Sequence, residues 1–243
     1  MSQIKITESS LKSKNIIYIY EMLSQITSQL GCLNNLRGGK NRYELLLDVP
    51  SSYRELIANE VEENIADVIS VNYKYSFFKK NVNLNGLNDL EQELLLVALI
   101  SADIEEDRKY IIKKLKEYSE YTLDGIYNFR LKALKEKWYD IVGCVPPSFR
   151  SSQLKDFIIY LVRDKARKRV YYDNGNVYDK RYNLLKRREL LAGDSLELPI
   201  LKEILLSSAG EIELASKLPE DDEKYIKDYY GNHVIFSSAY LKC

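Results

Sequence analysis

Apolar and polar residues follow regular periods along the first fifty residues, and these periods predict three elements. Residues 3–7 (QIKIT) alternate between polar and apolar side chains, which is typical of a half-buried strand. Residues 13–30 place apolar side chains three and four positions apart, which predicts an amphipathic helix, and the glycines of residues 31–39 end it. Residues 43–50 (YELLLDVP) predict a second strand, which ends at Pro50.

The following residues predict a long amphipathic helix that ends near residue 80. Glu55 follows Ser52 by three positions, which is the spacing of a capping box, so we expect both side chains to bind main-chain N–H groups at the helix start. Apolar side chains at helical spacing continue over residues 56–69. Residues 1–87 are therefore predicted to form an N-terminal βαβα segment.

The middle of the chain, residues 88–165, is predicted to be a helical layer. The sequence VPPSF at 145–149 interrupts it, because proline cannot continue a helix. The expected helices span 88–101, 104–118, 122–142 and 151–165.

Residues 166–243 are predicted to form a β-hairpin followed by a β-α-β crossover. The dipeptide Asn174-Gly175 suits a type I′ turn, which needs positive φ at both central residues. The expected facing pairs are Tyr172 with Val177, Tyr171 with Tyr178, and Val170 with Asp179. The elements after the hairpin are expected at 199–208 (helix), 211–215 (strand), 219–229 (helix) and 233–237 (strand).

These elements predict an α+β fold. A β-α-β crossover needs a neighbouring strand to pair with, and we expect the hairpin to supply it. The three segments, 1–87, 88–165 and 166–243, are expected to pack as one or two compact units. The C-terminal hairpin and crossover then share one small sheet.

Charge is distributed unevenly, although the 36 basic and 36 acidic residues give a formal net charge of zero. Residues 163–188 hold ten Lys or Arg against three Asp, a local excess of +7, whereas residues 189–243 have eleven acids against five bases, which gives −6. Two interpretations stay open. In the first interpretation, the basic segment binds nucleic acid. In the second, the basic and acidic segments attract each other within the fold.

The basic segment supplies the candidate binding residues. Its cations would neutralise phosphates, and its tyrosines would stack on the bases of a single strand. These residues are Lys168, Arg169, Tyr171, Tyr178, Lys180 and Arg181. In the competing interpretation, Val170, Tyr172 and Val177 form a core face of an ordinary hairpin, and the basic residues only fringe its other face.

Other composition features point to a cytoplasmic protein. Cys32, Cys144 and Cys243 form no C-x-x-C pair, and an odd number of cysteines without a disulfide framework favours a reducing compartment. The first fifteen residues are too polar for a signal peptide, and the apolar run at 94–100 is too short to span a bilayer. We therefore expect no membrane insertion.

Catalytic motifs are not recognisable in the sequence. His233 stands alone, which excludes paired-histidine mechanisms, and no P-loop, G-x-S-x-G or H-E-x-x-H pattern occurs. Acidic runs such as residues 220–223 are explained by helix starts, because acids favour the N-terminal end of a helix and Pro219 suits its first position. We expect no enzyme activity, metal or cofactor.

Residues 122–138 hold polar groups in an apolar neighbourhood. Gly125 costs about 1 kcal/mol relative to alanine inside a helix, so we expect close packing there. Arg130 would bind an anion or pair with Asp103 or Asp124. An enzyme site centred on Arg130 and Asn128 is a further hypothesis.

A series of segments from about residue 55 to the end occurs in a characteristic order: FFKKN, TLDGIYNFRL, QLKDFIIYLV, the Asn-Gly hairpin, ILLSSAGEIEL and YGNHVIF. The most specific of them is the block D-G-x-x-N-F-R-L at 124–131, with the motif residues Asp124, Gly125, Asn128, Phe129 and Arg130. In these segments and their order the chain resembles the YtxC-like family of sporulation-associated proteins of endospore-forming low-GC bacteria.

The resemblance implies a role in sporulation and a cytoplasmic location, but no activity and no catalytic residues. Relatives often carry cysteines near the C-terminus, whereas this chain has Cys243 alone there. We therefore predict a sporulation-associated protein that acts by binding a partner. The alternative is an RNA-binding or single-stranded-DNA-binding protein that uses residues 163–188.

Overall fold

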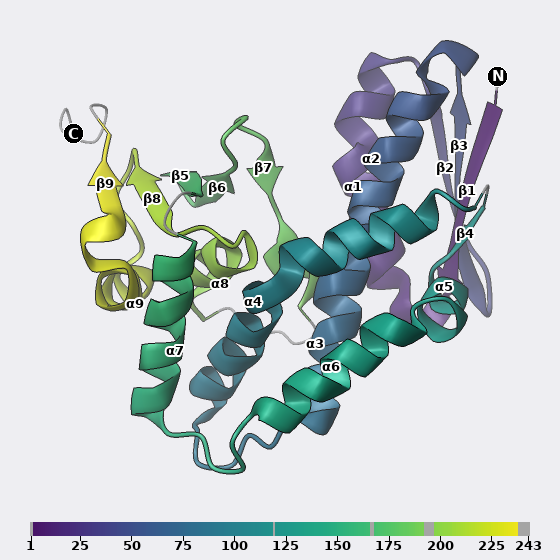
Figure 1. Cartoon of the computed structure of the whole chain (residues 1–243). Coiled ribbons are helices and arrows are strands. Elements are labelled where there is room, and N and C mark those ends of the chain that lie inside the picture. Colours follow the sequence, from purple (N-terminus) through teal and green to yellow (C-terminus); the bar gives the residue numbers. More distant parts are fainter. Residues whose placement is uncertain (1, 119, 166–167, 192–196, 238–243) are drawn as a thin grey trace. The chain divides into compact units, whose positions relative to one another are not determined.

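The computed structural model describes residues 2–118, 120–165, 168–191 and 197–237 (Figure 1). The chain divides into two compact units, and each takes two stretches of sequence. The first unit comprises Met1–Tyr73 and Glu105–Asp140, and the second comprises Lys74–Ile104 and Ile141–Cys243. None of the helices in the described ranges is long and apolar enough to cross a membrane.

A four-stranded sheet organises the first unit, in the order β2-β3-β1-β4. Its strands are β1 (Ser2–Ser9), β2 (Leu33–Gly38), β3 (Arg42–Val49) and β4 (Tyr121–Thr122). The pair β1–β3 is antiparallel and places Ile4 opposite Leu47 and Ile6 opposite Leu45. All four side chains are buried, so the core of this unit lies on their side of the sheet.

Helices cover this buried face of the sheet. Helix α1 (Ser13–Gln29) packs against β1 and β3 through Ile16, Ile19 and Leu23, which recur at helical spacing. Helix α2 (Arg54–Asp67) continues into the π-helix Val68–Tyr73. The unit is completed by α5 (Leu123–Phe129) and by parts of α4 (Asp89–Leu115) and α6 (Lys132–Cys144).

The N-terminal segment differs from the predicted βαβα order, because the residues expected to end the first helix also form strand β2. The order is therefore β-α-β-β-α. Strand β2 pairs with β3 along its length, but it is an edge strand with mostly exposed side chains. An exposed edge strand does not need the alternating apolar pattern by which strands are recognised.

The predicted capping box is wrong. Ser51–Tyr53 form a short 3₁₀ turn, and α2 begins only at Arg54, without a side-chain hydrogen bond at its cap. The predicted helix over 122–142 is also interrupted, since α5 ends at Phe129 and α6 starts at Lys132. The expected boundary between the helices of 88–101 and 104–118 appears as a kink in α4, where Asp103 has φ −136°.

A five-stranded sheet organises the second unit, in the order β7-β6-β5-β8-β9. Its strands are β5 (Arg169–Asp173), β6 (Asn176–Tyr178), β7 (Leu184–Leu185), β8 (Glu211–Leu214) and β9 (Val234–Phe236), and its helices are α3 (Lys74–Asn81), α7 (Ser151–Asp164), α8 (Pro199–Leu206) and α9 (Glu220–Tyr230). Strand β5 pairs parallel with β8, and β8 parallel with β9. The hairpin therefore supplies the neighbouring strand that the crossover needs, as predicted.

The hairpin turn confirms the sequence prediction at its centre. Asn174 and Gly175 have φ of 45° and 83°, the positive values of a type I′ turn. The pairs Tyr172–Val177 and Tyr171–Tyr178 are present. The third expected pair, with Asp179, is outside the ladder because β6 ends at Tyr178.

Asp222 has a different role from the one that its sequence position predicts. It lies in the acidic first turn of α9 but is 1% exposed, and Pro219 takes the cap position of that helix rather than its first residue. Its Oδ1 accepts a hydrogen bond at 2.8 Å from the main-chain N–H of Leu201, in the first turn of α8. Asp222 therefore caps a second helix.

Replacing this cap is expected to destabilise the second unit. Asp222→Ala would leave a buried N–H of α8 without its acceptor, so we expect the free energy of unfolding to fall by about 1–3 kcal/mol. Asp221→Ala, at the exposed neighbouring position, is the matched control and should change it by less than about 0.5 kcal/mol. Urea denaturation of both variants measures this, and equal effects would contradict the capping role.

Candidate functional site

The basic hairpin has one face in the core of the second unit and one face turned outward. Val170, Tyr172 and Val177 are at most 2% exposed, which confirms the predicted core face. Tyr171 and Tyr178 face each other on the outward side and are half-buried. The two tyrosines among the candidate binding residues therefore lie together on an accessible surface.

Arg169 is neutralised by the neighbouring strand. Because β8 runs parallel to β5, Glu211 faces Arg169, and Glu213 lies two positions further along, opposite Tyr171. The guanidinium donates twice to Glu211 Oε2, at 3.0 Å, and once to Glu213 Oε2, at 3.2 Å. The predicted attraction between the basic and acidic segments is thus confirmed at this residue, and Arg169 is occupied within the fold.

The remaining basic candidates lie on the surface. Lys168, Lys180 and Arg181 are all exposed. By contrast, Arg187 from the same basic segment is buried and donates a hydrogen bond to the carbonyl oxygen of Leu206 at 3.0 Å. Arg167, also in that segment, lies outside the described residues.

A tight turn of residues 179–183, here called the Asp179 turn, holds two of these cations. Asp179 Oδ1 accepts hydrogen bonds from the main-chain N–H groups of Arg181, at 2.8 Å, and of Asn183, at 2.9 Å. The main-chain N–H of Tyr182 donates to the carbonyl oxygen of Asp179 at 2.9 Å. The carboxylate of Asp179 is therefore used to shape the turn.

Tyr182 is a surface residue that the sequence did not single out. It is 69% exposed, and its ring stacks on that of Tyr171 with centroids 4.8 Å apart and an interplanar angle of 24°. No sequence signal marked it, because it is one of twenty tyrosines in the chain. Only the fold shows that this tyrosine covers another one.

A second constellation, here called the Glu8 cluster, lies in the first unit and contains Glu8, Lys12, Asn15, Tyr73 and Asp124. Glu8 is 0% exposed on β1, and its Oε1 accepts hydrogen bonds from Asn15 Nδ2, at 2.7 Å, and from the Tyr73 hydroxyl, at 3.0 Å. The same hydroxyl lies 3.0 Å from Asp124 Oδ1. Its single proton therefore has two carboxylate acceptors.

The two carboxylates of the Glu8 cluster have opposite pKa shifts. Burial raises the pKa of Glu8 to about 7, although the hydrogen bonds from Asn15 and Tyr73 oppose the rise. Burial acts in the same direction on Asp124, but the N–H of Ser9, at 2.9 Å, and the ammonium of Lys12, at 3.2 Å, lower its pKa overall. Near neutral pH the cluster can thus hold one exchangeable proton on Glu8.

Burial restricts what the Glu8 cluster can do. Glu8, Asn15 and Tyr73 are at most 3% exposed, so no substrate-sized molecule reaches the carboxyl of Glu8. Oε2 of Glu8 and Oδ1 of Asn15 are buried oxygens that accept no hydrogen bond from the described residues. The geometry fits an internal proton-sharing group better than an acid–base site for a substrate.

The family-motif residues are not brought together by the fold. Asp124 belongs to the Glu8 cluster, whereas Asn128, Phe129 and Arg130 are exposed at the end of α5. Gly125 has no positive φ, and an added Cβ would meet only the side chain of Thr122, at 3.3 Å, so the expected close helix packing is wrong.

Arg130 does not make the expected carboxylate pair. Its guanidinium lies 5.8 Å from the centre of the Tyr118 ring, while Lys12 takes the place beside Asp124. The expected partner Asp103 is bound by Lys74 within the second unit. Arg130 and Asn128 are both exposed on the first unit.

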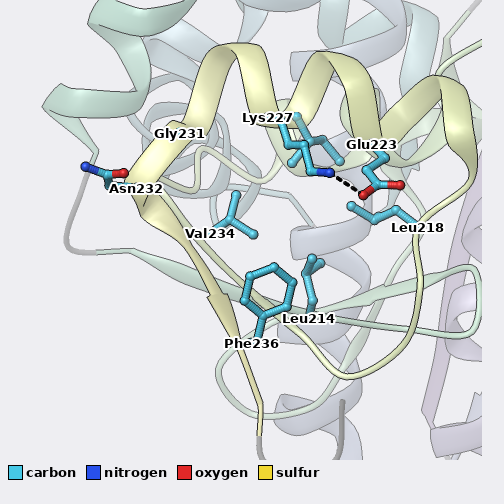
Figure 2. Close-up of a pocket in the computed structure, with 9 residues that line it drawn as sticks. Leu214, Leu218, Glu223, Lys227, Gly231, Asn232, Val234 and Phe236 are labelled. Carbon is cyan, nitrogen blue, oxygen red and sulfur yellow. Dashed lines mark hydrogen bonds and ion pairs between the residues drawn. The ribbon is translucent and has the colours of Figure 1, made fainter. Parts of the chain in front are cut away.

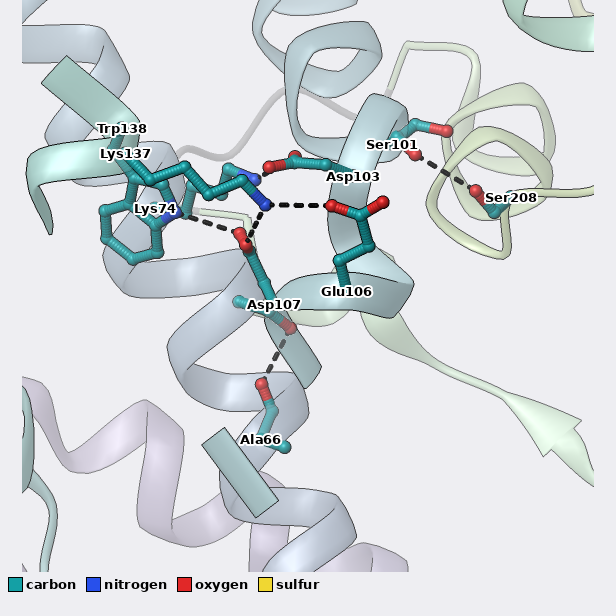
Figure 3. A network of polar contacts seen from close by, with 10 residues as sticks. Ala66, Lys74, Ser101, Asp103, Glu106, Asp107, Lys137, Trp138 and Ser208 are labelled. Carbon is teal, nitrogen blue, oxygen red and sulfur yellow. Dashed lines mark hydrogen bonds and ion pairs between the residues drawn. The ribbon is translucent and has the colours of Figure 1, made fainter. Parts of the chain in front are cut away.

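Two acidic side chains of α4 form internal hydrogen bonds and ion pairs (Figure 3). In the first unit, buried Asp107 accepts hydrogen bonds from Trp138 Nε1, at 2.9 Å, and from Lys137, at 2.8 Å. In the second unit, the ammonium of Lys74 is 0% exposed and pairs with Asp103. These buried charges are satisfied by partners far away in sequence, which sequence periods cannot reveal.

The second unit also contains a cavity of about 390 Å³ beside α9. Figure 2 shows Leu214, Val234 and Phe236 projecting towards the helix, and Glu223 and Lys227 forming an ion pair above them. The volume lies within the range of small-ligand sites, which is about 300–1,000 Å³. Its lining combines these apolar side chains with the polar Glu223, Lys227 and Asn232.

Potential metal ligands are scattered. Cys32 is buried and Cys144 is exposed, both as free thiols, while His233 is half-buried after α9. Cys243 lies outside the described residues. Within the described ranges, no group of three or more His, Cys, Asp or Glu side chains is arranged to hold a metal ion.

Comparisons with known proteins give no relatives: no family model matches the chain, and no curated protein or solved structure is significantly similar to it.

The Glu8 cluster predicts a pH-dependent stability. The pKa of Glu8 is raised on folding, so the folded chain binds more protons than the unfolded chain between about pH 4.5 and 7, and its stability falls as pH rises through this window. Glu8→Gln removes this titration. Between pH 5 and pH 8 the wild type should therefore lose roughly 2–3 kcal/mol more unfolding free energy than E8Q does.

Urea denaturation at several pH values measures this difference, and contributions from other titrating groups cancel because both proteins share them. Glu21→Gln, at an exposed position of α1, is the control and should follow the wild type at every pH. Parallel pH profiles for E8Q and the wild type would contradict the assignment.

Proposed function

We propose that this chain is a cytoplasmic, sporulation-associated protein that acts by binding a partner rather than by catalysis. The sporulation role is supported by the ordered resemblance of segments from about residue 55 onwards, above all by the block at 124–131. The binding role is supported by the way the fold uses its polar groups.

The observation that supports binding over catalysis is that buried carboxylates accept hydrogen bonds that hold parts of the fold together. Asp222 caps α8, and Glu203 accepts the main-chain N–H groups of Arg187, at 3.0 Å, and Arg188, at 2.9 Å. Asp124 accepts the N–H of Ser9. Groups held in this way stabilise the fold, while Lys180, Arg181 and Tyr182 beside the hairpin are exposed.

Deleting the gene in its spore-forming host tests the sporulation role. The number of heat-resistant spores should fall at least about tenfold while vegetative growth stays unchanged, and the wild-type gene supplied in trans should restore it. A deletion strain that forms spores normally would overturn the proposal.

A second candidate function is nucleic-acid binding through residues 163–188. The observation in its favour is that Lys180 and Arg181 stay exposed after strands β8 and β9 have docked and Arg169 has been neutralised. Within the described residues, no carboxylate forms an ion pair with either of these two side chains. They remain available to phosphates.

Salt-dependent binding tests this candidate. Affinity for labelled single-stranded RNA or DNA should fall steeply between about 50 and 200 mM salt, because each neutralised phosphate releases a counterion. Lys180→Ala/Arg181→Ala should lower the slope of log affinity against log salt by about 1.4. The control Lys79→Ala/Lys80→Ala removes two exposed cations from α3 in the second unit, outside residues 163–188, and should leave the slope unchanged. No binding by the wild type at 50 mM salt would exclude this function.

A further inference from the structure

Tyr182 has a backbone conformation that tyrosine rarely adopts. Its φ is 62°, in the left-handed region that glycine and asparagine tolerate best. The Asp179 turn fixes this conformation through the two hydrogen bonds to Asp179 Oδ1 and the contact between Tyr182 N–H and the Asp179 carbonyl. Hydrogen bonds therefore define the conformation of this turn.

Other positions with the same strain gain something inside the fold. Among the described non-glycine residues with positive φ, Leu198 and Ser208 are each 3% exposed, and Ser208 also donates a hydrogen bond to Ser101 O at 3.0 Å. Asn174 is a residue type suited to this conformation. Tyr182 differs from Leu198 and Ser208 because it is 69% exposed, so that core burial does not compensate for its strain. It differs from Asn174 because tyrosine is not a residue type suited to this conformation.

The strained turn places an aromatic face beside two cations. The ring of Tyr182 lies on Tyr171, which supports it from the sheet side, so its outer face is open to solvent. Lys180 and Arg181 immediately precede it and are exposed. Asp179, the nearest acidic residue in sequence, is engaged by main-chain N–H groups.

This arrangement matches the repeating unit of a nucleic-acid strand, which is a planar base next to an anionic phosphate. A base stacks on an aromatic side chain only if its own face is free, which favours single strands over a stacked duplex. Because tyrosine is also common at protein–protein interfaces, an acidic peptide is the competing ligand that the test has to exclude.

We propose that the Asp179 turn recognises single-stranded nucleic acid, with one base stacked on Tyr182 and adjacent phosphates bound by Lys180 and Arg181. The inference rests on the nucleic-acid function proposed above and adds the element that would carry it. Arg169 has no part in the contact, because Glu211 and Glu213 occupy its guanidinium.

Two substitutions of Tyr182 separate its ring from its backbone. Tyr182→Asn removes the ring but keeps a residue that tolerates positive φ, so the turn should persist. Tyr182→Phe keeps the ring and loses only the hydroxyl. Tyr160→Asn removes a 64% exposed tyrosine from α7 in the same unit and is the matched control.

Binding of labelled RNA and DNA oligonucleotides to the full chain is measured with each variant, together with a strand of equal length that carries abasic sites. We expect Y182N to weaken binding to the normal strand about tenfold or more, the usual effect of losing one stacked base. Y182F and Y160N should stay within about twofold of the wild type. The abasic strand should bind wild type and Y182N equally, because it retains its phosphates but has no base to stack. Comparison of the RNA and DNA arms shows which strand is preferred.

The outcomes distinguish the two levels of the proposal. No binding by the wild type overturns the nucleic-acid function itself. Binding that Y182N leaves unchanged overturns recognition by the turn but not the function. Equal weakening of binding by Y182N on the normal and the abasic strand excludes base stacking. An acidic peptide serves as a second ligand. Base stacking is also excluded if Lys180→Ala/Arg181→Ala abolishes binding of the peptide while Y182N changes the binding of neither the peptide nor the strand.

Discussion

The parallel pairing of β5 with β8 determines which charges of the second unit remain available to a partner. It sets Glu211 opposite Arg169 and brings Glu213 within reach of the same guanidinium. Arg169, one of the candidate phosphate-binding residues, is thereby used inside the fold. Lys180 and Arg181 lie outside this ladder, on the Asp179 turn, and stay at the surface. The register of β5 against β8 therefore decides which cations are paired within the fold and which remain exposed.

A related constraint acts in the interior, where every buried carboxylate needs hydrogen-bond donors. Uncompensated burial of a charge is costly. At Asp222 and Asp107, main-chain N–H groups and distant side chains offset this cost, whereas at Glu8 burial raises the pKa of the carboxyl. Asp222 uses the start of α8, and Asp107 uses Trp138 and Lys137. The acidic residues of the helices thus fix how those helices contact their neighbours, which is a structural role.

The elements that depend on local sequence could be predicted, and those that depend on distant partners could not. The Asn174-Gly175 turn and its two central pairs were predicted, because turn geometry is set by the two residues themselves. Strand β2 was missed, since an edge strand pairs through its backbone and its exposed side chains need no apolar period. The Glu8 cluster was missed except for Asp124, because its members come from three separate stretches of sequence.

The same reasoning explains why the candidate binding surface was only half visible in the sequence. Its cations and Tyr171 could be named from composition and alternation. The place of Tyr182 in this surface depends on its left-handed φ and on its stacking against the Tyr171 ring, and the sequence shows neither. Both turns of this region use positive φ, yet one uses Asn-Gly, which adopts it cheaply, and the other uses a tyrosine, which does not. If shaping the chain were the sole requirement, glycine or asparagine would serve at position 182 as well. The presence of an exposed aromatic ring at the more costly turn is therefore the feature that a binding function explains.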